Sequence, residues 1–147
     1  MKKIRIALGS NDGENIFLGH MGMAEDFYVY DLFENGNSNF VEKRKNTSPE
    51  EKGKHGLIKK MKAVMEILKD VDVIIGRRMS PNFRNISAGT KFQPVVVEID
   101  KVSEIMREMT KSFDEIYSLV EQRKRGERPK EIPKLGKELP QRELEYK

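Results

Sequence analysis

Short apolar segments separated by turn residues dominate the first hundred residues of the chain. Residues 3–8 alternate between charged and apolar side chains and then become apolar, and residues 26–33 are rich in aromatic and β-branched side chains. Both patterns predict β-strands. Residues 34–37 contain an Asn-Gly pair, which predicts a hairpin turn because these residues accept positive φ angles. Residues 39–45 then predict a charged strand at the edge of a sheet.

The following elements alternate between helix and strand. Apolar side chains at helical spacing predict a helix that begins near Gly56. Two apolar runs, residues 71–75 and 94–98, predict buried strands. Between these runs, Ser80 precedes a proline and predicts the N-cap of a short helix over residues 81–88.

The last third of the chain has a different character. An apolar stripe over residues 101–124 predicts one long helix, which Asp100 would cap. Residues 125–147 are charged and contain three prolines, so we expect an extended or disordered tail that buries no core. The sequence therefore predicts an α/β domain over residues 1–100, a helix and a tail.

This order of elements predicts an α/β fold with a mixed five-stranded sheet. A hairpin followed by right-handed crossovers gives the strand order 3-2-1-4-5, with strand 2 antiparallel and helices on both faces. The carboxyl ends of parallel strands share one edge of a sheet. We therefore expect residues 9–20 and 76–82 to meet there, with residues 53–56 nearby.

Composition narrows the chemistry that the chain can perform. There is no cysteine, which excludes disulfides and thiolate metal sites, and there are only two histidines. The net charge of +4 permits anion binding but is weak evidence for nucleic acid, which we do not expect as a partner. No apolar run approaches the roughly 20 residues of a membrane helix. The N-terminus lacks the apolar segment of a signal peptide, so we expect a cytoplasmic protein.

Several polar and basic residues fall in the loops expected at the shared edge. Ser10 and Asn11 follow the first strand, in a loop whose backbone N–H groups could face an anion. Arg77 and Arg78 leave a buried strand, where they could clamp an anion or pair with nearby carboxylates. Asn82 could join this site or serve the start of the short helix.

The two histidines are the candidate metal ligands. His20 lies in a loop of small residues before a strand. Its imidazole could bind a metal, pair with an anion, or bond to nearby backbone. His55 opens the first predicted helix, whose N-terminus attracts anions, although a surface histidine in this position is equally consistent with the pattern.

Three segments of the chain are similar to the sequence motifs of one known protein family. Residues 19–27, Gly-His-Met-Gly-Met-Ala-Glu-Asp-Phe, are similar to a His-Phe-Gly-Arg/His-Ala-Pro-x-Phe motif. His55-Gly56 precedes a helix, and residues 72–82 are similar to a strand followed by Gly-x-x-Gly-Pro-Asn/Arg. In this order, and with matching spacing over residues 2–98, they resemble the dinitrogenase iron–molybdenum cofactor biosynthesis family, whose members are nitrogenase accessory factor-like proteins.

The resemblance implies a ribonuclease H-like fold and a link to nitrogen fixation. It also implies a non-catalytic carrier for an anionic iron–sulfur or iron–molybdenum cofactor precursor, or for a related small anion. The residues that it places at the site are His20, His55, Arg77, Arg78 and Asn82. The sequence departs from the motif at four positions: Met21 replaces an aromatic residue, Met23 an arginine or histidine, Glu25 a proline, and Ser80 a glycine.

Two other functions stay open at the level of sequence. The chain could be an interaction module that uses the long helix and basic tail to bind a partner protein or a second copy of itself. It could also be a metal-dependent nuclease, which would need clustered carboxylates. The first strand supplies none, and Asp12, Asp26 and Asp72 are not obviously convergent. The sequence has no serine-nucleophile elbow and no nucleotide-binding glycine motif, so we do not expect an enzyme.

Overall fold

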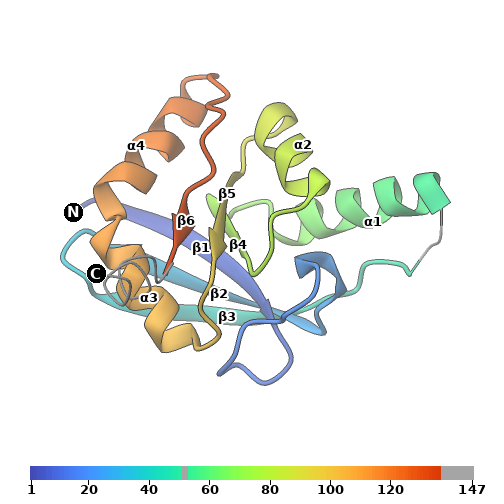
Figure 1. Ribbon diagram of the computed structural model, residues 1–147, viewed down its shortest axis with the longest axis horizontal. Helices are drawn as coiled ribbons and strands as arrows, with labels where there is room; N and C mark the ends of the chain where they lie inside the picture. Colours follow the sequence, from blue (N-terminus) through green and yellow to red (C-terminus); the bar gives the residue numbers. More distant parts are fainter. Residues whose placement is uncertain (51–52, 137–147) are drawn as a thin grey trace, which may run out of the picture.

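A mixed six-stranded sheet runs through this computed structural model, which describes residues 1–50 and 53–136, without the side chains of residues 54–57 (Figure 1). The strands are β1 (Lys3–Ser10), β2 (Asp26–Phe33), β3 (Ser38–Lys45), β4 (Val73–Gly76), β5 (Gln93–Val97) and β6 (Lys134–Leu135). Their order is β3-β2-β1-β4-β5-β6. The pairs β1–β2 and β2–β3 are antiparallel, and the other pairs are parallel. The predicted order and the antiparallel second strand are confirmed, and β6 extends the sheet.

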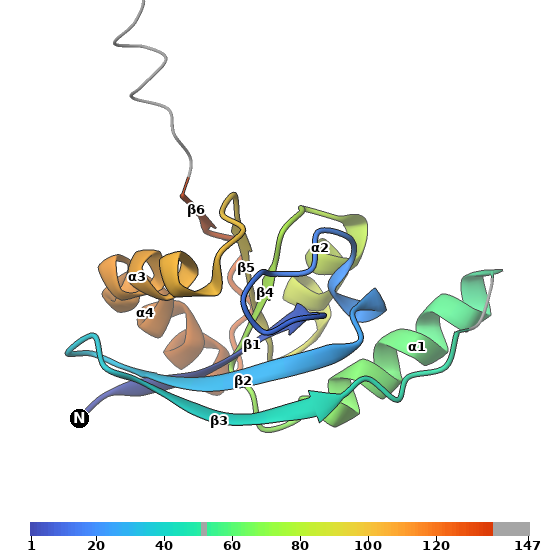
Figure 2. The ribbon, with the colours of Figure 1, turned by 90° about the horizontal axis from the view of Figure 1, so that it is seen from below.

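Helices cover both faces of the sheet (Figure 2). They are the short 3-10 helix η1 (Met21–Met23), α1 (Gly53–Ile67), α2 (Pro81–Gly89), α3 (Val102–Lys111) and α4 (Phe113–Lys124). On one face, Ile6 and Leu8 of β1 share a core with apolar residues of α3 and α4. On the other face, Ala7 shares a second core with residues of η1 and α2. Successive β1 side chains thus serve opposite faces, as the two-residue period of a strand requires.

The N-terminus of α2 follows the local sequence closely. The Ser80 side chain accepts a hydrogen bond from the backbone N–H of Phe83 at 3.2 Å, and Pro81 occupies the first turn. The predicted cap and helix are therefore confirmed. Gly76, at the end of β4, lies against the Phe83 ring, and a Cβ at this position would be 2.5 Å from the ring. The missing side chain lets α2 pack closely over the strand that precedes it.

The prediction of one long helix over residues 101–124 is wrong. The chain breaks at Ser112 into α3 and α4, which lie at an angle to each other in Figure 1. Met109 and Phe113 are buried on the two sides of the break, so the apolar spacing continues through it and does not reveal it. Asp100 is not the cap either: Lys101 is the N-cap residue, and the Asp100 carboxylate accepts a hydrogen bond from Arg77 instead.

The structure also differs from the tail predicted over residues 125–147. Leu135 is 8% exposed and joins the core beneath α3 and α4. The backbone N–H groups of Val96 and Glu98 donate to the carbonyls of Pro133 and Leu135. Two buried residues, Pro133 and Leu135, and these backbone bonds add β6 at the edge of the sheet, although the segment is rich in charge and proline. Residues 137–147, the rest of the predicted tail, lie outside the described part of the chain.

No helix among the described residues is both long and apolar enough to cross a membrane.

Candidate functional site

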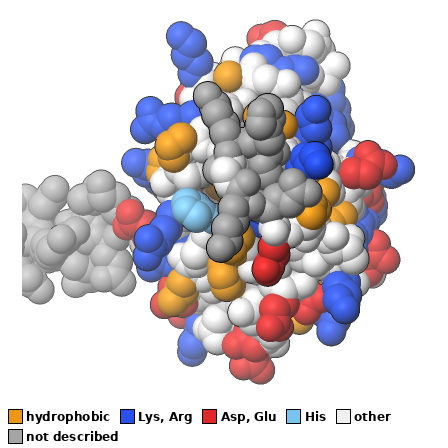
Figure 3. Space-filling model, turned by 90° about the vertical axis from the view of Figure 1, so that its right-hand side faces the viewer, with side chains coloured by type: hydrophobic (Ala, Val, Ile, Leu, Met, Phe, Trp, Pro, Cys, Tyr) orange, Lys and Arg blue, Asp and Glu red, His pale blue; other side chains and the backbone are white. Residues whose placement is uncertain are grey.

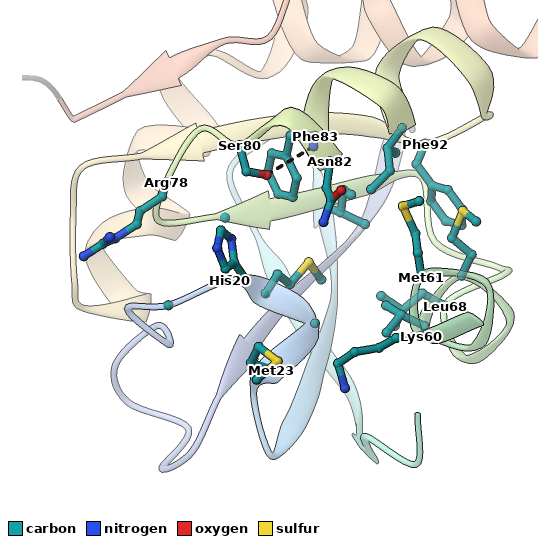
Figure 4. Close-up of a pocket in the computed structure, with 18 of the residues that line it drawn as sticks. His20, Met23, Lys60, Met61, Leu68, Arg78, Ser80, Asn82, Phe83 and Phe92 are labelled. Carbon is teal, nitrogen blue, oxygen red and sulfur yellow. Dashed lines mark hydrogen bonds between the residues drawn. The ribbon is translucent and has the colours of Figure 1, made fainter. Parts of the chain in front are cut away.

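A cavity of about 130 Å³ lies between η1, α1, α2 and the end of β4 (Figure 4). Most of its wall is apolar, from Met21, Met23, Met61, Val64, Met65, Leu68, Ile74, Phe83, Ile86 and Phe92. In Figure 4, Ser80, Asn82 and Phe83 lie along one edge, and Met23 and Lys60 lie along the opposite edge. The side of the molecule from which α1 projects mixes lysine and arginine with exposed hydrophobic side chains (Figure 3).

Four residues predicted from the sequence meet at this cavity. His20, Arg77, Arg78 and Asn82 all belong to its lining. They come from the loop before η1 and from the segment that joins β4 to the first turn of α2, and these meet because β1 and β4 are parallel neighbours in the sheet.

Two close contacts fix the His20 loop against the sheet. A Cβ on Gly9 of β1 would be 2.6 Å from the Cβ of Ala24, so glycine is required where this loop crosses the strand. The Asn46 side-chain amide donates to the carbonyls of Gly22 and Ala24, each at 2.8 Å. These contacts hold the backbone around η1 and leave the preceding His20 side chain exposed at the rim.

The His20 imidazole is available to a ligand. His20 occupies the N-cap of η1, but its side chain makes no capping hydrogen bond. Its imidazole also has no hydrogen-bond or ion-pair partner in the described part of the chain. The alternative that His20 simply bonds to nearby backbone is therefore not what the structure shows. His55 lies in the first turn of α1, but its side chain is outside the described residues, so its role as a ligand stays a prediction.

The two arginines differ in their surroundings. The Arg77 Nε donates to Asp100 Oδ1 at 2.9 Å, so much of its charge is already balanced. Arg77 also borders a second, polar hollow lined by Glu98, Asp100, Lys101 and Glu104. Arg78 is exposed and makes no ion pair with a described residue, and in Figure 4 its side chain extends outward from the rim. The structure therefore shows the ion-pair alternative for Arg77, and the role of Arg78 as an anion clamp stays a prediction.

Ser10 and Asn11 do not line the cavity. Ser10 is fully buried, and its hydroxyl donates to the Asn15 carbonyl at 2.5 Å and accepts from the Gly13 N–H at 2.8 Å. Asn11 Oδ1 accepts from the backbone N–H of Glu25 at 3.0 Å. Hydrogen bonds from the backbone N–H groups of Asn15 and Glu14 also lower the pKa of Asp12 to about 2. The hydrogen bonds of Ser10, Asn11 and Asp12 therefore stabilise the conformation of this loop and its contact with residue 25.

Sequence reasoning missed the contribution of α1. The helical spacing of apolar residues indicates only that Met61 and Met65 lie on the buried side of a helix, and nothing in the sequence singles out Lys60, yet all three line the cavity. The sequence did contain a signal for a methionine-lined site. Met21 and Met23 depart from the family motif, and Met61 and Met65 are four residues apart on one helix face.

The lining gives little support to a hard metal ion. Among residues 1–50 and 53–136, no aspartate or glutamate lines the cavity. The same residues contain no group of three or more His, Cys, Asp or Glu side chains that could hold a metal ion. The groups that face the cavity are an imidazole, thioethers, an amide and cationic side chains, which suit a soft or anionic ligand better than a bare divalent cation.

Comparison with protein-family models gives a match to the dinitrogenase iron–molybdenum cofactor family over residues 2–112. The chain belongs to this family. The match runs from β1 to the end of α3 and includes every element around the cavity. A search of curated proteins found none that matches the chain. The dinitrogenase iron–molybdenum cofactor family is linked to biosynthesis or binding of that cofactor, and it is generally a carrier or accessory family rather than a catalytic one.

Proposed function

We propose that this chain is a non-catalytic carrier for an anionic metal–sulfide cargo, such as an iron–sulfur or iron–molybdenum cofactor precursor, or for a related small anion. One observation carries the proposal. His20, Arg77, Arg78 and Asn82 lie around an apolar cavity whose described lining contains no carboxylate. Among these described residues, a negatively charged ligand would meet only neutral and positively charged groups.

Each group has a distinct part in this proposal. The His20 imidazole has no partner among the described residues and would bind a metal of the cargo through a ring nitrogen. The Asn82 amide lies in the first turn of α2, where the positive end of the helix dipole favours an anion. Arg78 adds positive charge at the rim. Because His20 and Arg78 are exposed, a cargo held there stays accessible to a receiving protein, as a carrier requires.

Anaerobic loading tests the proposal. The purified protein is mixed with iron and sulfide, or with an isolated cofactor precursor, and visible absorbance and bound iron are measured after desalting. We expect stoichiometric colour in the wild type and its loss in His20→Ala. The proposal is refuted if His20→Ala and the double variant Arg77→Ala/Arg78→Ala both retain all candidate clusters as well as the wild type.

The interaction-module alternative relies on the predicted long helix and the basic tail. Ile105, Met109 and Ile116 of this helical region are each fully buried against the protein's own sheet, so these side chains do not offer an apolar surface to a partner. A homodimer through this region stays a prediction, and we do not adopt it here. No observation among the described residues favours nuclease activity.

A further inference from the structure

An exposed aromatic side chain lies on β3, the outer strand of the sheet. Phe40 is 55% exposed, and its ring centroid lies 6.1 Å from that of Tyr28 and 5.3 Å from that of Tyr30. The two tyrosines pack partly against the core beneath α3 and α4, whereas more than half of Phe40 faces solvent. The three rings form an apolar patch at the margin of the sheet, and such patches mark sites of interaction.

The backbone of β3 is also open to a partner. The strand is eight residues long and, within residues 1–50 and 53–136, pairs only with β2, so its other side carries unpaired N–H and carbonyl groups (Figure 2). A long open edge pairs readily with another strand, and charged side chains, especially lysines, are the usual protection against this. The charges of β3 all lie in its second half, because residues 38–41 are uncharged. Phe40 therefore lies in the half of the edge that has no such protection.

The hydrogen bonds to β2 show which backbone groups of β3 face outward. At one end of the ladder the Asn46 N–H donates to the Glu25 carbonyl at 3.0 Å, and at the other end the Phe33 N–H donates to the Asn37 carbonyl at 2.9 Å. Both bonds continue the register of the ladder by one residue, and bonded and non-bonded pairs alternate along antiparallel strands. Counting inward from each end to the register shift in the middle gives the residues whose backbone groups point away from β2. They are Ser38, Phe40, Lys43 and Lys45.

These four residues match one another when two copies of β3 run antiparallel. In one register Phe40 of each copy is opposite Lys43 of the other, and Ser38 is then opposite Lys45. No other antiparallel register pairs all four outward-facing residues among themselves. It also sets no two like charges directly opposite, an arrangement that would be unfavourable.

The side chains of Phe40 and Lys43 suit this pairing. Lys43 is opposite Tyr28 in the ladder, so it lies on the same face of the sheet as the aromatic patch. It is exposed and makes no ion pair with a described residue. Across the seam its ammonium can therefore lie over the exposed Phe40 ring of the other copy, which is a favourable cation–π contact.

We infer that β3 is an interface between two copies of this chain, which pair antiparallel about a two-fold axis and join their sheets into one. The symmetry makes every contact occur twice. The inference is independent of the proposed carrier function. It also differs from the homodimer predicted from the sequence, which would use the C-terminal helical region.

Sedimentation velocity of the full chain over a range of concentrations tests the interface. We expect the wild type to form a dimer. In Phe40→Lys the ring is lost and like charges become opposite at two places, so we expect the dissociation constant of the dimer to rise at least about 10-fold. Leu18→Lys is the matched control, because Leu18 is 54% exposed, lies outside β3 and does not line the cavity. It adds the same charge, and we expect it to dimerise like the wild type.

Thiol cross-linking tests the register and leaves Phe40 in place. The chain has no cysteine, so Ser38→Cys and Lys45→Cys each introduce a single thiol. Opposite residues of a hydrogen-bonded antiparallel pair have Cα atoms about 5.5 Å apart, a separation that a disulfide can span. When the two variants are mixed and oxidised, we expect the mixed disulfide in large excess over random pairing.

Three results would count against the inference. A wild type that is monomeric at every concentration would overturn it and leave the edge of β3 to a different strand. Equal dimerisation of Phe40→Lys and Leu18→Lys, both folded by circular dichroism, would overturn it by showing that the dimer contact lies elsewhere. Random cross-linking of the two cysteine variants would overturn the register.

Discussion

Removal of the Arg123 side chain should strongly destabilise the fold. Although this side chain is charged, it is 3% exposed, and all its hydrogen-bond partners are neutral. Three of its bonds are buried: to Gln93 Oε1 at 2.7 Å, to the Ser87 carbonyl at 2.8 Å and to Ser87 Oγ at 2.8 Å. Two more reach the carbonyls of Thr90 and Pro129 at 3.0 and 3.1 Å in partly buried surroundings. The guanidinium therefore ties α2, β5 and the chain before β6 to α4.

The expected loss in free energy of unfolding follows from the three buried hydrogen bonds. In Arg123→Met, these acceptors lose their donor in a place that water does not reach, at a cost of about 1–3 kcal/mol each. Burial lowers the pKa of Arg123 to about 10, which shows that desolvation of the charge opposes part of the gain. The net loss in free energy of unfolding should be about 2–5 kcal/mol, because the removal of a poorly solvated charge offsets part of the cost of three unsatisfied acceptors.

Urea denaturation followed by circular dichroism measures this loss through the unfolding midpoint and slope. Arg125→Met is the control, because Arg125 is exposed and its side chain pairs with the exposed Glu127, so its loss should cost less than about 1 kcal/mol. Arg123→Lys should not restore stability, since an ammonium cannot reproduce the fork of N–H donors. A loss below about 1 kcal/mol in Arg123→Met would show that the network contributes no net stability and would refute the reasoning.

Two further predictions concern stability. Gly76→Ala should cost about 1–3 kcal/mol by forcing a Cβ against the Phe83 ring, whereas Gly89→Ala, with no atom within 4 Å, should cost nothing in the same urea titration; equal effects would contradict the packing argument. Hydrogen bonds from Arg44 and Arg5 hold the pKa of Asp70 well below its ordinary value of 3.8. The stability that this carboxylate contributes is present above that ordinary value and is lost as the pH falls through the lower pKa of the folded state. Asp70→Asn should therefore show a flatter stability profile between about pH 2 and 6, and an unchanged profile would argue against this linkage.

Most of the sheet could be predicted because its information is local. The aromatic run of β2 and the Ser80 cap of α2 each depend on a few adjacent residues, and both were predicted correctly. The break at Ser112 could not be predicted, since the apolar spacing is the same on both sides of it. Nor could β6, because Leu135 finds its place only through β5, which is about forty residues earlier in the chain.

The candidate site also has residues that the sequence predicts and residues that depend on tertiary packing. The meeting of His20 with the Arg77 loop follows from the parallel pairing of β1 and β4, which the order of elements predicts. The contribution of Lys60 depends instead on how α1 is rotated about its axis. Lysines occur on several faces of that helix, and only the folded structure shows that the stem of Lys60 lines the cavity while its ammonium donates to Ser48.

The Arg123 network also shows that the family match and the supporting structure of the site end at different places. The match stops at residue 112. Phe83 and Ile86 of α2 line the cavity, and the C-terminal part of this helix is hydrogen-bonded at Ser87 by Arg123, eleven residues beyond the match. A protein shortened to the shared family region would keep every residue that lines the cavity and lose the brace behind one of its walls. The segment beyond the family match thus forms part of the scaffold that supports the candidate site.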